Sequence, residues 1–198
     1  MNRLFSLVFS ILLTCSSGAL AQHDGTATSE SAGATSPEIR QFDFLVGEWE
    51  IEVHPKVSGL AAMIHGVPRL VGTWKAWRAF DGLGVEDELR IVDASGNPIS
   101  LIHSLRIYAK AEGHWNVSGL DAYRARLSDA TGQWKGSEMD MNGHGVDAEG
   151  KPFVSRTRYF NITPDGFRMQ QDRSADNGQS WDEAVVTVDA KRATAPAH

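Results

Sequence analysis

The sequence predicts an all-β protein, an antiparallel up-and-down meander closed into a calycin-like barrel, with at most short helical turns. Residues 48–53 alternate strictly between apolar and polar side chains, and residues 182–190 carry an apolar row at every second position from Ala184 to Ala190, which is typical of strands with one buried face. No segment of ten or more residues has a convincing helical period. Short strands separated by turn signals favour a meander, and closure of a long meander removes its edge strands.

The first 21 residues have the form of an export signal. An apolar stretch at residues 4–13 is too short to span a bilayer, and it leads to the small-x-small site Ala-Leu-Ala21. We therefore expect a periplasmic or secreted protein that is cleaved after Ala21. The alternative is a lipoprotein, because Leu-Leu-Thr-Cys15 resembles a lipobox whose cysteine becomes the lipidated first residue. Thr before Cys15 departs from the usual Gly, Ala or Ser and favours cleavage at Ala21.

The chain divides into a signal, a tether, one domain and a tail. Residues 22–37 contain no large apolar side chain and are rich in Ser, Thr, Ala and Gly, so they predict a disordered tether. Residues 193–198 predict a shorter disordered tail. Residues 38–192 form the barrel domain, which is large enough for a real core. Cleavage after Ala21 would leave no cysteine, which excludes disulfides and cysteine nucleophiles.

The charge pattern favours neither nucleic acid nor a membrane surface as a partner. The chain carries 19 basic and 25 acidic residues, a net charge of -6, without a basic run. Nothing in this balance favours nucleic acid. The domain has no apolar stretch of the length that a membrane span needs.

Turn signals divide the domain into strands. Gly, Pro, Asn and Asp cluster at short intervals, typical of reversals between neighbouring strands. These clusters predict turns at residues 93–98, 112–113, 129–132, 142–145, 148–150 and 163–166. Short helical turns are possible at residues 37–45 and 59–64.

One motif near the C-terminus has the form S-x-D-x-G-x-x-W, made by Ser174, Asp176, Gly178 and Trp181. It resembles the Asp-box of sialidase-type propellers, whose Asp and Ser side chains accept hydrogen bonds from turn amides above a packed Trp. Those propellers need several copies of the box and a cluster of catalytic groups. This chain has one copy and no internal repeat, so a structural hairpin is expected and a glycosidase is not.

A second motif, F-D-F-L-x-G-x-W, contains Gly47 and Trp49 at the start of the first expected strand. G-x-W in this position resembles the calycins, which include lipocalins, fatty-acid-binding proteins and nitrobindins. The resemblance implies that Trp49 closes one end of the barrel and that a basic residue of the last strand, here Arg192, lies across it. The two end motifs together resemble an exported bacterial family of unknown function with a calycin-like barrel, which implies no particular reaction.

The large and charged side chains of the expected strands include candidates for ligand binding. Trp74 and Trp77 have opposite parity, so one of them faces inward. Arg156 and Arg158 share one face of residues 153–162, and either that face or the opposite one is the inner face. The candidates for a cavity that fixes the acidic head of an amphipathic ligand are Trp77, Arg106, Tyr108, Arg156 and Arg158. Arginines on the outer surface are the alternative.

The sequence gives little indication of a metal, a cofactor or a catalytic site. The domain histidines have no paired ligand spacing, so neither a metal nor a haem is expected. They are His54, His65, His103, His114 and His144. An enzyme of the hydratase or isomerase type could use cavity acids such as Glu88 or Asp172.

The expected function is binding of a small apolar or amphipathic molecule inside an exported barrel. A cavity enzyme and an envelope protein-interaction module are the alternatives. Residues 55–67 break the strand pattern with Pro and Gly but carry large apolar side chains, so we expect them to form a loop over the barrel mouth.

Overall fold

The computed structural model describes residues 36–57, 66, 68–147 and 149–194. These residues form three short 3-10 helices and ten strands. The helices are η1 Pro37–Arg40, η2 Asp43–Leu45 and η3 Phe80–Gly82. The strands are β1 Gly47–Pro55, β2 Leu70–Ala79, β3 Gly84–Asp93, β4 Pro98–Ala109, β5 His114–Asp121, β6 Arg126–Lys135, β7 Glu138–Val146, β8 Pro152–Thr163, β9 Gly166–Ser174 and β10 Asp182–Arg192.

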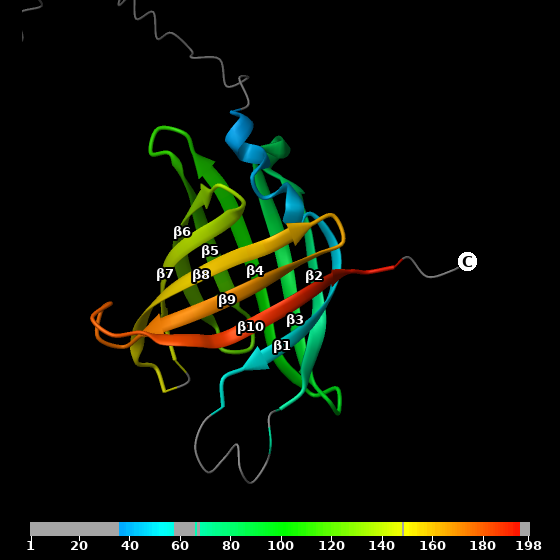
Figure 1. The fold of residues 1–198 in the computed structure, drawn as a ribbon, viewed down its shortest axis with the longest axis vertical. Helices are drawn as coiled ribbons and strands as arrows, with labels where there is room; N and C mark the ends of the chain where they lie inside the picture. The colour runs from blue at the N-terminus through cyan, green and yellow to red at the C-terminus, as the bar shows by residue number, and fades with distance from the viewer. Residues whose placement is uncertain (1–35, 58–65, 67, 148, 195–198) are drawn as a thin grey trace, which may run out of the picture. The chain divides into compact units, whose positions relative to one another are not determined.

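The ten strands form one closed antiparallel barrel in which each strand pairs with its neighbours in sequence and β10 pairs with β1. Figure 1 shows the meander winding around the barrel, with η1 and η2 at one end. The predicted fold class is confirmed, and the helical turn expected at residues 37–45 corresponds to η1 and η2.

Closure joins the two end motifs. Trp49 is paired directly with Arg192 across the β1–β10 ladder, and the guanidinium carbon of Arg192 lies 4.1 Å from the centre of the Trp49 ring. The predicted stacking of the basic residue over the tryptophan is confirmed. A Cβ on Gly47 would lie 2.4 Å from Nη1 of Arg192, so the glycine of G-x-W leaves room for the arginine. Trp49 Nε1 donates to the Leu45 carbonyl at 2.7 Å.

A double-mutant cycle should measure this contact. Because the Arg192 side chain is exposed to solvent, the coupling free energy between Trp49→Leu and Arg192→Met is expected to be about 0.5–1 kcal/mol, the usual range for an exposed cation–π pair. Urea unfolding of the four proteins gives the value. Replacing Arg192 with Met keeps an aliphatic stem, so the cycle isolates the charge. A coupling of zero would show that the contact is only packing.

The end of the barrel beside η1 and η2 is filled. Phe42 and Leu45 are completely buried, and the Phe42 ring meets Trp115 edge-on with 4.9 Å between centroids. Arg78 of β2 fixes the helical segment, because it donates to the Ile39 carbonyl at 2.7 Å and forms an ion pair with Asp43. The apolar core is therefore a plug at this end, and any cavity must lie toward the other end.

Two expected turns are wrong. Residues 129–132 and 142–145 lie inside β6 and β7, and the chain turns instead at residues 122–125 and 136–137. The glycines of these segments allow close approach inside the sheet. A Cβ on Gly143 would meet the Asp129 carbonyl at 2.8 Å, and one on Gly145 would meet the Phe153 ring at 2.7 Å.

The S-x-D-x-G-x-x-W segment is a structural hairpin between β9 and β10, as predicted. Buried Ser174 accepts a hydrogen bond from the Gly178 amide at 2.7 Å and donates to Asp176 at 2.6 Å. Asp176 accepts from the Ser180 amide at 2.8 Å. Trp181 donates to the Gly178 carbonyl at 3.1 Å. Every polar group of the motif is used inside the turn, so its chemistry is structural.

Ser174→Ala should lower the free energy of unfolding by about 1–3 kcal/mol, because the Gly178 amide loses its acceptor.

Asp176→Ala should also destabilise the protein, by an amount that decreases in acid. The hydroxyls of Ser174 and Ser180 hold the pKa of Asp176 well below its usual range. A carboxylate whose pKa is lowered by folding contributes stability at neutral pH that is lost as the pH falls below the ordinary carboxyl range. Thermal melts of Asp176→Ala and the parent should therefore converge in acid, and a constant difference would contradict this role.

Some predictions lie outside the described residues. They are the signal at residues 1–21, most of the tether at 22–37, the helical turn at 59–64, most of the loop at 55–67 and most of the tail at 193–198. In the part of the chain that the structure describes, no helix is long and apolar enough to cross a membrane.

Candidate functional site

A cavity of about 300 Å³ lies inside the barrel, between the plugged end and the opposite rim. Its lining includes small residues at inward positions of β5 and β7, namely Gly119, Gly143 and Gly145. The exposed side chains of Arg124 and Leu127 are among its lining residues, so the cavity opens at the rim away from η2.

The floor of the cavity holds a buried ion pair. Asp87 and Arg106 are 1% and 3% exposed and contact each other directly. Trp74 Nε1 donates to the other Asp87 oxygen at 2.7 Å, and the Arg106 guanidinium lies 5.2 Å from the Phe42 ring centre on the plugged side. The pair is thus held between the plug and the cavity, with its two charges balanced.

Arg106 remains a cation in this setting. Burial lowers the pKa of Arg106, and Tyr159 opposes this by hydrogen bonding to the guanidinium. An arginine side chain is not deprotonated in proteins, so Arg106 keeps its charge. Its Nε has no acceptor among the described residues. The floor therefore offers one buried N–H donor on a side chain whose net charge is already neutralised.

One wall of the cavity carries polar side chains from β8 and β9. Arg173 and Gln171 are paired in register with Ser155 and Thr157, and all four line the cavity. Arg173 Nε donates to Gln171 Oε1 at 2.8 Å, and its guanidinium lies 4.4 Å from the Phe153 ring centre. Burial lowers the pKa of Arg173, and Asp147 raises it by a smaller amount.

The other charged groups of the cavity have protein partners. Arg124 pairs with Asp121 at 2.6 Å, and His144 lies 3.4 Å from Asp129 at the exposed rim. Arg126 donates to the Asp147 carbonyl. The remaining lining side chains are mainly apolar and include Leu89, Ile102, Val117, Ala130, Met141 and Met169.

Four of the five predicted ligand-binding residues do not line this cavity, which corrects that hypothesis. Trp77 lies on the outer face, 41% exposed, against His103, while Trp74 faces inward. Arg156 and Arg158 are also outside, because the inner face of β8 is formed by Tyr159 and by every second residue before it, back to Phe153. Tyr108 points inward at the plugged end, against Trp115, and does not line the cavity.

Of the five, only Arg106 lines the cavity. The two outer arginines of β8 are instead bound to surface partners. Arg156 pairs with Asp172 at 3.2 Å and stacks on Trp181 at 3.8 Å. Arg158 lies 3.6 Å from Glu138. The sequence did not point to Asp87 or Arg173, although a signal existed: Asp87 shares parity with Val85, Leu89 and Ile91, and Arg173 shares parity with Phe167, Met169 and Gln171.

The acids suggested for catalysis are not in the cavity. Glu88 pairs with Arg90 at 3.2 Å, and Asp172 accepts from the Ala184 amide at 2.9 Å on the outer side of β9. The carboxylates that do line the cavity, Asp87, Asp121 and Asp129, are each paired with a basic side chain. No described lining residue is therefore a carboxylate without a partner.

The described histidines lie apart from one another. His54 pairs with Asp189, His103 with Glu86, His114 with Glu112 and His144 with Asp129, and His65 lies outside the described residues. No group of three or more His, Cys, Asp or Glu side chains in the described ranges is arranged to hold a metal ion.

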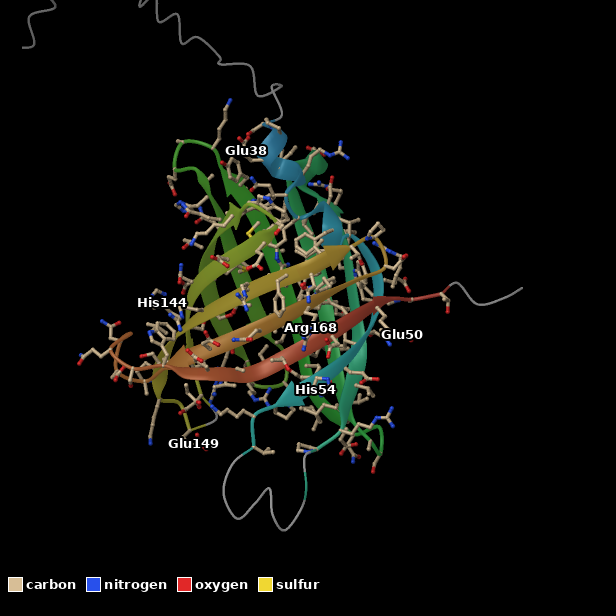
Figure 2. All side chains as sticks on the ribbon, viewed as in Figure 1. Glu38, Glu50, His54, His144, Glu149 and Arg168 are labelled. Carbon is tan, nitrogen blue, oxygen red and sulfur yellow. The ribbon has the colours of Figure 1, made fainter. Side chains whose placement is uncertain are left out.

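The outer surface has two distinct regions. A groove of about 820 Å³ crosses β1, β2, β8, β9 and β10, and its lining combines charged side chains such as Glu50 and Arg168 with apolar ones such as Ile51 and Phe167. Figure 2 shows Glu50 and Arg168 on this side of the barrel, with His54 nearby. Exposed apolar side chains gather instead on β2 to β6 and include Trp77, Leu105, Ile107, Leu120 and Leu127. That apolar strip is the feature of the described residues that fits an interaction module.

Comparison with known proteins gives a likeness of fold. No family model and no curated protein matches the chain. Among solved structures, it is similar to the S-type phycobiliprotein lyase CPES from Guillardia theta, with 12% sequence identity and a TM-score of 0.50. The match covers 79% of this chain and 92% of the lyase chain. The fold is a calycin-like barrel. At this identity the comparison extends to the fold alone.

Proposed function

We propose that this protein is an exported carrier that binds a small amphipathic molecule inside its barrel. The main observation in support is the cavity of about 300 Å³, which is open at one end. Its volume lies at the small end of the range of about 300–1,000 Å³ typical of ligand pockets. Its lining combines apolar side chains with a few polar groups, which is the usual composition of a small-molecule site.

Two further observations support this function. The cavity carboxylates are all engaged by basic partners, which favours a carrier over an enzyme that needs a free acid or base. The similar solved barrel is named a phycobiliprotein lyase, and that name agrees with a role for such a barrel in handling a small organic group. Export and membership of the exported barrel family rest on the first 21 residues and the two end motifs.

A blocking variant tests the site. Ala130→Phe places a ring in the cavity, since Ala130 lines it, and should reduce by more than about tenfold the amount of small molecule that native mass spectrometry detects on the exported protein. Thr131→Phe is the matched control, because the next residue faces outward and is exposed. Ala130→Leu repeats the test with less bulk if the first variant does not fold.

Equal retention by Ala130→Phe and Thr131→Phe would contradict a cavity site. N-terminal sequencing of the same preparation tests export. A chain that starts at Gln22 supports cleavage after Ala21, and a lipidated Cys15 at the N-terminus contradicts it.

A further inference from the structure

Arg173 holds a positive charge inside the barrel. Its position follows from the alternation of β9, which turns Phe167, Met169 and Arg173 to the same inner face. The guanidinium is fixed on one side by the Phe153 ring at 4.4 Å and at Nε by Gln171 at 2.8 Å. Phe153 in turn packs on Gly145, where a Cβ would be 2.7 Å from the ring. The arginine is therefore positioned before any ligand arrives.

Arg173 has no direct counter-charge in the part of the chain that the structure describes. Among the described residues no carboxylate forms an ion pair with it, and Asp147 acts only from a distance. In contrast, Arg106 and Arg124, which also line the cavity, form ion pairs with Asp87 and Asp121. The Arg173 side chain is half-buried, and a charge that is partly withdrawn from water without a partner is unfavourable. An anionic group on the ligand would provide that partner.

Arg106, across the barrel from Arg173, suits a different part of a ligand. The cross-strand register runs from Arg106 through Val117, Ala130, Gly143 and Ser155 to Arg173, so the two arginines stand five strands apart in a ten-stranded barrel. At the floor Asp87 already neutralises Arg106. A second negative charge there would be repelled by Asp87, whereas the free Arg106 Nε–H can donate a hydrogen bond to an uncharged oxygen of a ligand.

We propose that the ligand is a small organic monoanion, whose carboxylate or similar acidic group binds Arg173 near the rim and whose apolar body extends toward the floor. The body would contact apolar lining residues such as Leu89, Ile102, Val117, Met141 and Met169. This inference rests on the proposed carrier function, and it adds the charge, the orientation and the anchoring residue.

Octanoate, 1-octanol and octanedioate test the inference, because they share a chain length and differ in charge. Isothermal titration calorimetry at pH 7 should show octanoate binding about tenfold or more tightly than either 1-octanol or octanedioate, as expected for one charge-assisted hydrogen-bonded pair. Arg173→Met should remove the preference of octanoate over 1-octanol and leave the affinity for 1-octanol unchanged. Arg173→Lys should restore part of the preference.

Arg158→Met is the matched control, since Arg158 lies on the outer face of the neighbouring strand, and it should bind all three compounds as the parent does. Equal affinity of the parent for octanoate and 1-octanol, or a preference that survives in Arg173→Met, would overturn the inference and leave the carrier function standing. Failure of both compounds to bind the parent would overturn the two together. Arg173→Gln replaces the methionine variant if the latter does not fold.

Discussion

Asp87→Ala is expected to lower the free energy of unfolding by about 3–5 kcal/mol, the cost of leaving one member of a buried ion pair without its partner. Asp87 is 1% exposed, contacts Arg106 directly and accepts a hydrogen bond from Trp74 at 2.7 Å. The alanine variant leaves both the Arg106 guanidinium and the Trp74 indole N–H buried and unsatisfied. Urea unfolding followed by circular dichroism measures the loss.

Two controls make the result specific to the buried pair. Asp140→Ala breaks a surface pair with Lys135 at 3.1 Å and should change stability by less than about 1 kcal/mol. The double variant Asp87→Leu/Arg106→Met removes both charges and should recover most of the stability lost by Asp87→Ala. If Asp87→Ala were as stable as Asp140→Ala, the floor of the cavity would be hydrated rather than buried.

Phe42→Ala is expected to have a similarly large effect, a loss of about 3–5 kcal/mol. The ring is completely buried, contacts Trp115 at 4.9 Å and covers the Arg106 guanidinium at 5.2 Å. Its removal would leave a void in the plug and open the buried ion pair to water. Thermal and urea unfolding measure the stability, and the near-ultraviolet circular dichroism of the surrounding aromatic rings should weaken.

Phe80→Ala provides the comparison for Phe42→Ala. The Phe80 side chain is 39% exposed on the outside of the barrel, so its truncation should cost about 1 kcal/mol or less. A loss at Phe42 no larger than that at Phe80 would show that the helical segment η1 to η2 is a loosely attached cover. The barrel end would then be open rather than plugged.

Local patterns in the sequence predict the closure of the barrel well. The alternation of the two end strands gives Trp49 and Arg192 inward parity, and the calycin resemblance of the G-x-W motif implied that they meet, as they do. Asp176 and its neighbours form the expected hairpin. The parities and the hairpin were predictable because each depends on side chains within a few residues or on a single strand.

The residues that line the cavity were harder to predict from the sequence. On β8 both faces carry aromatic and polar side chains, so parity did not decide between Arg158 and Tyr159. The decision comes from the register that sets Tyr159 beside Met139 and Met169. Glycines that suggested turns at residues 129–132 and 142–145 serve close packing inside strands. These outcomes depend on partners many residues away, which a local pattern does not contain.

The central claim is that the interior of the barrel is a binding site, and a crystal structure of the exported protein with octanoate tests it most directly. We predict electron density for the ligand inside the barrel, with its carboxylate at Arg173 and its chain directed toward Arg106. Density for octanoate only on the apolar strip of Trp77, Leu105, Ile107, Leu120 and Leu127, with the interior holding water alone, would contradict the claim.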